Sequence, residues 1–170
     1  MRVCYFGTYR AGYNRNKIMI SALKSAGVEV IICQENLWYG IEDREQITAG
    51  GWRSPKFWWR VIKTYIKLIW KFFSIGEFDV MILGYPGQFD VFLGKLYCGL
   101  KRKKLVWDVF MSVYLVAVER KLEDSRYSAV RMIKRLEKKA LGIPDLLIQD
   151  TRQYVDWFFQ TYGVEVERFR

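Results

Sequence analysis

The stretch VCYFGTYRAGYNRNKIMISALKSAGVEVIIC, residues 3–33, indicates how the chain folds. An apolar run at 3–7 ends at Gly7 and predicts a strand, and a polar loop that contains glycine follows it. Residues 17–27 have helical spacing and end at Gly27, and the apolar run at 28–33 predicts a second strand. A strand, loop, helix and strand within about 30 residues make up one parallel crossover unit.

The same alternation continues to the end of the chain. Further strands are predicted at 78–84, 105–110 and 145–150, and helices at 89–100, 113–141 with a break near 123–128, and 151–163 with Thr151 or Asp150 as its cap. Residues 34–51 lack a clear period, and 164–170 are expected to end the chain without a partner element. The pattern predicts an α/β fold: a Rossmann-like doubly wound parallel sheet of about five strands with helices on both faces, in a single domain over residues 1–170.

The composition indicates the cellular compartment of the protein and the kind of surface that it binds. A net charge of +10 on 170 residues favours an anionic partner surface. The chain has no histidine, which removes the usual general base, and its three cysteines lack metal spacing, so no metal site is predicted. Those cysteines fit core thiols in a reducing cytosol, which predicts a cytoplasmic protein. No run approaches the roughly 18 uncharged apolar residues that a spanning helix needs.

The most unusual segment is WRSPKFWWRVIKTYIKLIWKFF, residues 52–73, which holds six basic residues and no acid. The basic residues are spaced by 3, 4, 3, 4 and 4 positions, so on a helix they form one stripe beside a wide apolar face. One interpretation is a helix that covers the sheet and has a solvated basic edge. The other adds a membrane-surface role, because tryptophans beside lysines suit the boundary of anionic lipid. The candidate membrane-surface residues are Trp58, Trp59, Arg60, Lys63, Lys67, Trp70 and Lys71. Nucleic-acid binding is not predicted, because no nucleic-acid module surrounds these residues.

Open α/β sheets bind ligands at the carboxyl ends of their strands. The candidate binding loops are therefore those after the first, third, fourth and fifth predicted strands. The first loop lacks both the G-x-G-x-x-G and the P-loop patterns, so nicotinamide binding and P-loop hydrolysis are rejected. Asp108, at a strand end, is a weak catalytic candidate, and no other catalytic residue is predicted. The candidate cleft residues are Gly7, Thr8, Tyr9, Arg10, Tyr13, Asn14, Tyr85, Gln88, Asp108, Ser112, Thr151 and Arg152.

Several motifs together resemble the N-terminal half of GT-B glycosyltransferases of the family 4 type. The opening over residues 1–33 resembles the strand, glycine-bearing loop and helix with which those enzymes begin, and FDVMILGYPGQFDVFLGKL (78–96) resembles their third strand and turn. KKLVWDVFMSVY (103–114) resembles their fourth strand, and KKALGIPDLLIQDTRQYVDWFFQTYGVEVERFR (138–170) is the most specific match. Members of the family often carry a histidine after the fourth strand, and this chain has Asp108 in that neighbourhood.

The resemblance implies the acceptor-binding domain of an enzyme that moves a sugar from a nucleotide-sugar donor to a membrane-associated or lipid-linked acceptor. No cofactor is expected in this domain, because the donor would be held by a C-terminal domain that this chain lacks, supplied in cis or in trans. The domain alone is expected to be inactive and to lie peripherally on the cytoplasmic membrane face. Two alternatives remain open: a stand-alone membrane-recruiting subunit of a two-chain glycosyltransferase, and a non-catalytic α/β interaction domain.

Overall fold

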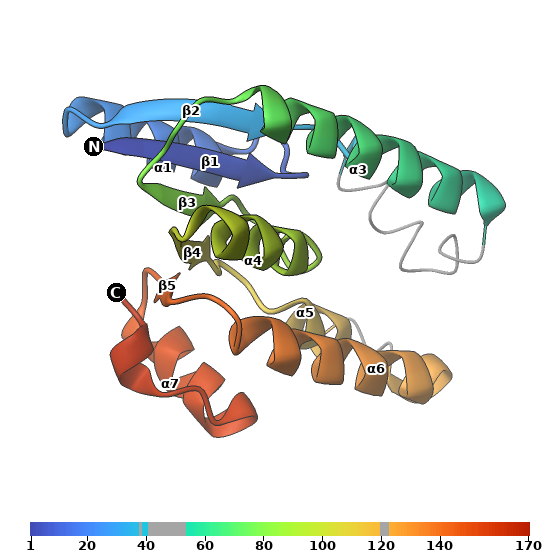
Figure 1. Ribbon diagram of the computed structural model, residues 1–170. Helices are drawn as coiled ribbons and strands as arrows, with labels where there is room; N and C mark the ends of the chain where they lie inside the picture. Colours follow the sequence, from blue (N-terminus) through green and yellow to red (C-terminus); the bar gives the residue numbers. More distant parts are fainter. Residues whose placement is uncertain (38, 41–53, 120–122) are drawn as a thin grey trace.

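A five-stranded, fully parallel sheet organises the computed structural model, which describes residues 1–37, 39–40, 54–119 and 123–170, without the side chains of 123–129 (Figure 1). The strands are β1 (Arg2–Gly7), β2 (Glu29–Gln34), β3 (Val80–Leu83), β4 (Lys104–Asp108) and β5 (Leu146–Ile148). Their order is β2-β1-β3-β4-β5. The predicted Rossmann-like α/β fold is confirmed, and the strand order reverses between β1 and β3, where such sheets bind ligands.

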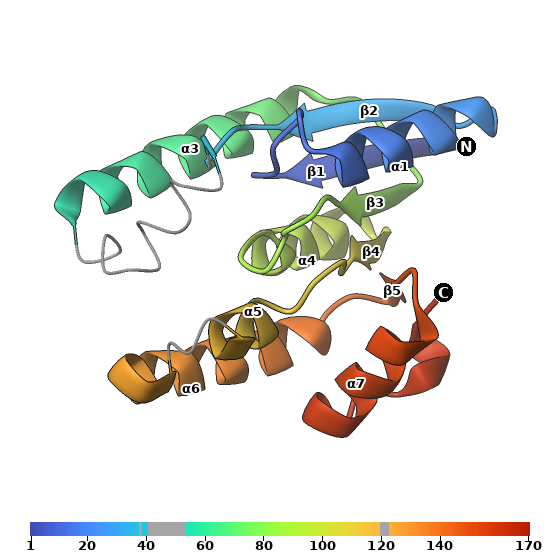
Figure 2. The same cartoon turned by 180° about the vertical axis from the view of Figure 1, so that it is seen from behind.

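Helices cover both faces of the sheet. The helices are α1 (Asn14–Ser25), α3 (Pro55–Ser74), α4 (Asp90–Lys101), α5 (Val113–Glu119), α6 (Glu123–Leu141) and α7 (Arg152–Tyr162), with a 3₁₀ turn at Val166–Arg168. Helices α3, α4 and α6 lie on one face (Figure 1), and α1 lies on the other (Figure 2). The larger core cluster lies under α3 and α4, and a smaller cluster around Tyr5 lies under α1.

Helix α3 is longer than the sheet that it covers. Its 20 residues span about 30 Å at 1.5 Å per residue, whereas strands of 4 to 6 residues span roughly 13–20 Å. Pro55 occupies the first turn, where a helix tolerates proline. The first half of α3 therefore extends beyond the edge at which all five strands end, called here the carboxyl edge (Figure 1). The predicted loop at 48–51 and the beginning of the basic segment, Trp52 and Arg53, lie outside the described residues.

The break that was predicted near 123–128 falls just before that stretch, because α5 ends at Glu119 and α6 begins at Glu123. The prediction for the last residues of the chain was wrong. Residues 164–170 do find a partner, because Phe169 forms a parallel bridge with Leu147 and the Arg170 amide donates to the Leu147 carbonyl at 2.9 Å. The segment after α7 thus returns to the edge of the sheet beside β5, as a further right-handed crossover would bring it.

Gly84, directly after β3, provides a test of this packing. A Cβ atom at Gly84 would lie 2.6 Å from the Tyr9 ring and 2.8 Å from the Tyr5 ring, which are both buried. We expect Gly84→Ala to lower the free energy of unfolding by about 1–3 kcal/mol, because the two rings have no room to move. Urea unfolding followed by circular dichroism measures this change.

Gly99 supplies the matched control. It lies within α4 with nothing within 4 Å of the added Cβ, so Gly99→Ala should leave stability unchanged or raise it by up to about 1 kcal/mol through helix propensity. Equal stability of the two variants would show that the Tyr5 and Tyr9 rings do not confine the turn after β3.

Candidate functional site at the carboxyl edge

The loops after β1, β3, β4 and β5 form one hydrogen-bonded assembly at the carboxyl edge. The buried Asn16 side chain joins the first two, since its Oδ1 accepts from the Tyr85 amide at 3.0 Å and its Nδ2 donates to the Arg10 carbonyl at 3.3 Å. Gln149 Nε2 donates to the Val109 carbonyl at 2.8 Å and so joins the last two loops. These side chains compensate the burial of loop backbone and fix the positions of the loops.

A row of aromatic rings crosses this edge. The Tyr13 and Tyr85 ring centroids lie 5.3 Å apart, and Phe110 meets Tyr85 edge-on at 5.4 Å. The Arg15 guanidinium lies over the Phe110 ring at 5.0 Å. Tyr13 and Phe110 are partly exposed, whereas Tyr85 is buried between them. Partly exposed aromatic rings of this kind provide an apolar platform for a ligand that also needs polar contacts.

Arg15 is the electrostatic centre of the site. Its Nη2 donates to Asp108 Oδ1 at 2.8 Å, its Nε lies 3.1 Å from Asp108 Oδ2, and its Nη1 donates to Asp150 at 3.0 Å. Burial raises the pKa of the Asp108 carboxyl, and the guanidinium opposes that rise. The carboxylate in turn raises the pKa of Arg15. Asp108, with both oxygens bonded to Arg15, is arranged to orient Arg15, whereas Asp150 is 40% exposed and can accept further hydrogen bonds from a ligand.

Two other predicted residues surround a buried acid that the sequence analysis did not identify. The Thr8 amide donates to Asp90 at 2.7 Å, and the Thr8 hydroxyl lies 3.0 Å from the same carboxylate. A Cβ atom on Gly7 would lie 2.7 Å from Asp90, so only glycine allows this approach. Tyr65 of α3 donates to Asp90 at 2.8 Å. Gly7 and Thr8 therefore join β1 to α3 and α4 inside the protein.

The remaining cleft candidates are distributed between the interior and the surface. Ser112 is buried and donates to the buried Glu137 at 2.6 Å, and Tyr9 is buried beside Gly84. Thr151 caps α7, as predicted. Gln88 is buried, and its Nε2 lies 3.5 Å from the Met111 carbonyl. The surface holds Arg10 and Asn14 beside Tyr13, and Arg152, whose side chain is 80% exposed and lies 4.0 Å from Asp156.

The structure thus brings together Arg10, Tyr13, Tyr85 and Asp108 of the predicted residues and adds Arg15, Phe110 and Asp150 to them. The sequence patterns did not indicate the buried polar residues Asn16, Asp90 and Glu137. One feature of the sequence could have indicated these residues, because each is a polar residue within or beside an otherwise apolar helix face. Among the described residues, no group of three or more acids or cysteines is arranged to hold a metal ion.

The candidate membrane-surface residues all lie on α3 but on two different sides of it. Trp58, Trp59 and Trp70 are exposed on the outer side of the helix. Arg60, Lys63 and Lys67 line a cavity beside the end of β2. Lys71 donates to the Gln34 carbonyl at 2.8 Å, which ties α3 to the same strand end. Within the described part of the chain, no helix has the length and apolar character needed to cross a membrane.

The Arg15–Asp108 ion pair yields a stability prediction. Asp108→Asn keeps the shape of the side chain but removes the charge that Arg15 faces, and breaking a buried pair in this way costs about 3 kcal/mol. Asp156→Asn removes an exposed acid 4.0 Å from Arg152 and should cost less than about 0.5 kcal/mol. Chemical denaturation measures both. Equal effects of the two substitutions would mean that the buried pair does not stabilise the carboxyl edge.

Comparison with known proteins assigns no family to this chain. No protein-family model matches the chain, and no curated protein matches it.

Proposed function

We propose that this chain is the acceptor-binding domain of a GT-B glycosyltransferase whose acceptor is held at a membrane surface. The observation that carries the proposal is an exposed apolar surface on α3 and α4 that leads to the loops of the carboxyl edge. The resemblance to glycosyltransferases of the family 4 type and the aromatic row beside Arg15 and Asp150 support the same function.

The apolar surface consists of exposed side chains on two neighbouring helices. Large apolar side chains on the two helices are between 40% and 73% exposed, and such contiguous patches mark interaction sites. We name this surface the apolar ridge, and its members are Trp58, Trp59, Ile62, Ile66, Trp70 and Phe73 of α3, Phe89 directly before α4, and Phe92, Leu96 and Leu100 of α4. The two helices are held side by side by the stacked rings of Phe72 and Tyr97, whose centroids are 3.7 Å apart.

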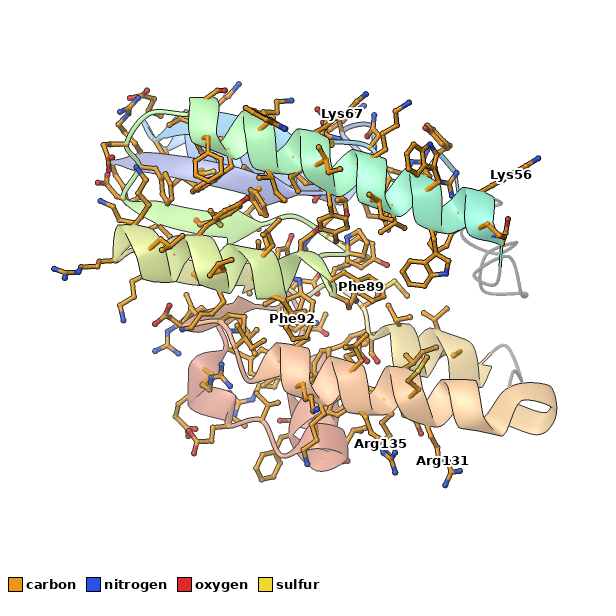
Figure 3. The ribbon with its side chains drawn as sticks, turned by 45° about the vertical axis from the view of Figure 1, so that its right-hand side comes forward. Lys56, Lys67, Phe89, Phe92, Arg131 and Arg135 are labelled. Atoms are coloured by element: carbon orange, nitrogen blue, oxygen red, sulfur yellow. The ribbon has the colours of Figure 1, made fainter. Side chains whose placement is uncertain are left out.

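Charge complementarity selects anionic lipid as the occupant of the ridge. Lys56 and Lys67 project from α3 on one side of it, and Arg131 and Arg135 project from α6 on the other (Figure 3). Exposed aromatic residues between basic residues match the boundary between acyl chains and anionic headgroups. The net charge of +10 adds a long-range attraction to the same surface.

The ridge also orients the site. Phe89 begins the α4 half of the ridge and follows Tyr85 and Gln88 in the same loop, so a lipid surface on the ridge would lie next to the carboxyl edge. There the Tyr13 and Phe110 rings would stack on a sugar ring and Asp150 would accept hydrogen bonds from its hydroxyls. The nucleotide-sugar donor would come from a second domain, in cis or in trans, so we expect no turnover by this chain alone. A membrane-recruiting subunit of a two-chain enzyme would use the same ridge.

Saccharide binding tests the acceptor-side assignment. We expect saturation-transfer NMR to detect contacts between simple methyl glycosides and the protein, because the aromatic row is partly exposed. Tyr13→Ala should weaken these contacts several-fold, whereas Phe159→Ala, which removes an exposed ring on α7, should leave them unchanged. Binding of nucleotide-sugars without binding of saccharides would show that the acceptor-side assignment is wrong.

Vesicle sedimentation tests the membrane assignment. The protein should bind phosphatidylcholine vesicles that contain phosphatidylserine, less strongly as salt rises, and bind pure phosphatidylcholine weakly. The double variant Ile66→Ser, Leu96→Ser should bind roughly a hundredfold more weakly, because each of the two aliphatic side chains contributes about 1.5 kcal/mol when it is buried in lipid and about 1.4 kcal/mol corresponds to tenfold.

The control for this experiment is Ile18→Ser on α1, where Ile18 is as exposed as the ridge residues but lies on the opposite face of the sheet. It should bind vesicles like the unchanged protein. If Ile18→Ser and the ridge variant bind equally, the ridge is not the membrane contact.

A further inference from the structure

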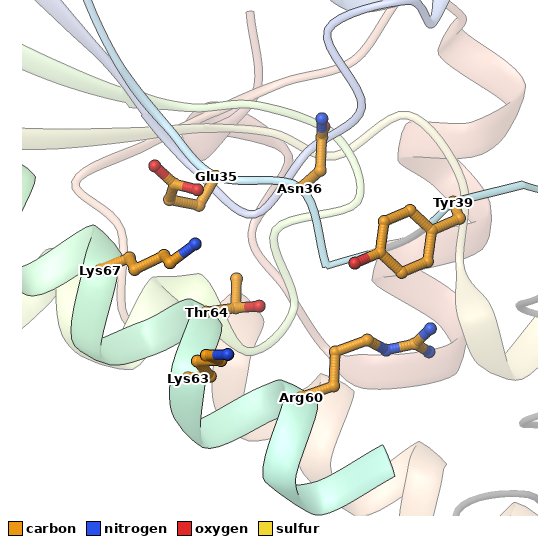
Figure 4. A pocket seen from close by; sticks show the side chains of 7 residues that line it. All are labelled: Glu35, Asn36, Tyr39, Arg60, Lys63, Thr64 and Lys67. Atoms are coloured by element: carbon orange, nitrogen blue, oxygen red, sulfur yellow. The ribbon is translucent and has the colours of Figure 1, made fainter. Parts of the chain in front are cut away.

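A polar cavity of about 320 Å³ lies between α3 and the segment that follows β2 (Figure 4). It is separate from the aromatic row and lies on the side of α3 away from α4. Its lining residues are Glu35, Asn36, Tyr39, Arg60, Lys63, Thr64 and Lys67. Neither the proposed acceptor site nor the apolar ridge gives this cavity a role.

The wall of the cavity formed by α3 is strongly basic. Arg60, Lys63 and Lys67 follow one another at spacings of three and four residues, which places them on one side of the helix. Within the described part of the chain, neither Lys63 nor Lys67 forms a salt bridge. The single acid of the lining, Glu35, lies 3.6 Å from Lys71, so its charge is shared with a cation outside the cavity.

Two polar groups of the cavity are held in position before any ligand arrives. The Arg60 guanidinium lies over the Tyr39 ring at 5.1 Å and over the Phe57 ring at 5.5 Å. Asn36 accepts a hydrogen bond from Gln34 at 2.7 Å through its Oδ1, which orients its amide group. Thr64 is 93% buried and lies in the lining between Lys63 and Lys67 (Figure 4). Fixed donors lower the entropy cost of binding.

We propose that this cavity binds the phosphate group of a phosphate monoester or diester. Three cations with hydroxyl and amide donors match an anion that carries several oxygens, because guanidinium binds phosphate through paired N–H groups and lysine contributes point charge. The volume equals about ten waters at roughly 30 Å³ each, which accommodates a phosphate with a small attached group. Either a lipid headgroup or a soluble phosphate compound has this chemistry.

Titration with soluble phosphates tests the site without a membrane. We expect amide shifts of residues around Lys63 and Lys67 to change saturably on addition of inorganic phosphate or glycerol 3-phosphate, at about 0.15 M salt, where charges beyond roughly 8 Å are screened. Lys67→Gln should weaken binding by about tenfold, and Thr64→Val, which keeps the shape of the side chain, should weaken it several-fold. Thermal unfolding of each variant verifies that it is folded.

The matched control is Lys56→Gln, which removes the same charge from the same helix outside the cavity lining. It should bind soluble phosphate like the unchanged protein. Absence of saturable binding, or equal weakening by Lys56→Gln and Lys67→Gln, would overturn the proposal, because both results would mean that only diffuse positive charge attracts the anion.

Competition then identifies the source of the phosphate. If glycerol 3-phosphate displaces the protein from phosphatidylcholine vesicles that contain phosphatidic acid, the cavity takes a lipid headgroup. If it binds the cavity without displacing the protein, the ligand is a soluble phosphate compound. The ridge variant Ile66→Ser, Leu96→Ser should retain soluble phosphate binding in both cases, so failure of the membrane assignment is distinguishable from failure of the cavity assignment.

Discussion

Three donors converge on the buried carboxylate of Asp90, and the remaining architecture depends on this interaction. The Thr8 amide and hydroxyl reach Asp90 from the end of β1, and the Tyr65 hydroxyl reaches it from α3. Burial raises the pKa of the Asp90 carboxyl above its ordinary value, and these hydrogen bonds oppose the rise. Because Asp90 is itself the first residue of α4, one side chain sets the positions of β1, α3 and α4 at the carboxyl edge.

Helix α3 contributes to the core, to the apolar ridge and to the cavity. Thr64, Leu68 and Phe72 are its buried residues, six of its exposed apolar side chains belong to the apolar ridge, and Arg60, Lys63 and Lys67 line the cavity. An ordinary sheet-covering helix needs only the first of these three faces. Since Tyr65 bonds Asp90, the ridge and the cavity keep fixed positions relative to the loops that hold the aromatic row.

The fold could be predicted from sequence because it depends on local patterns, whereas the site depends on contacts between distant residues. Short runs of apolar residues, together with the glycines that mark the ends of neighbouring helices, predicted all five strands. The spacing of the basic residues predicted α3. The sequence around Asp90 does not indicate its contact with Thr8, which is 82 residues away. Likewise, the sequence around Asp108 does not indicate its ion pair with Arg15, which is 93 residues away. The α4 half of the ridge was missed because Phe92 and Leu96 look like core residues in a mostly apolar helix. Phe169 was missed because a single bridge has no period.

The ion pairs of Arg15 affect when the carboxyl edge can form during synthesis of the chain. Arg15 pairs with Asp108 and Asp150, which follow it by 93 and 135 residues. Translation delivers the chain from its N-terminus at roughly 5–20 residues per second, so the first loop leaves the ribosome seconds before its partners exist. Contacts between residues so distant in sequence also form slowly. The carboxyl edge is therefore among the last regions able to reach its final charge arrangement, and a nascent chain carries Arg15 without its partners until then.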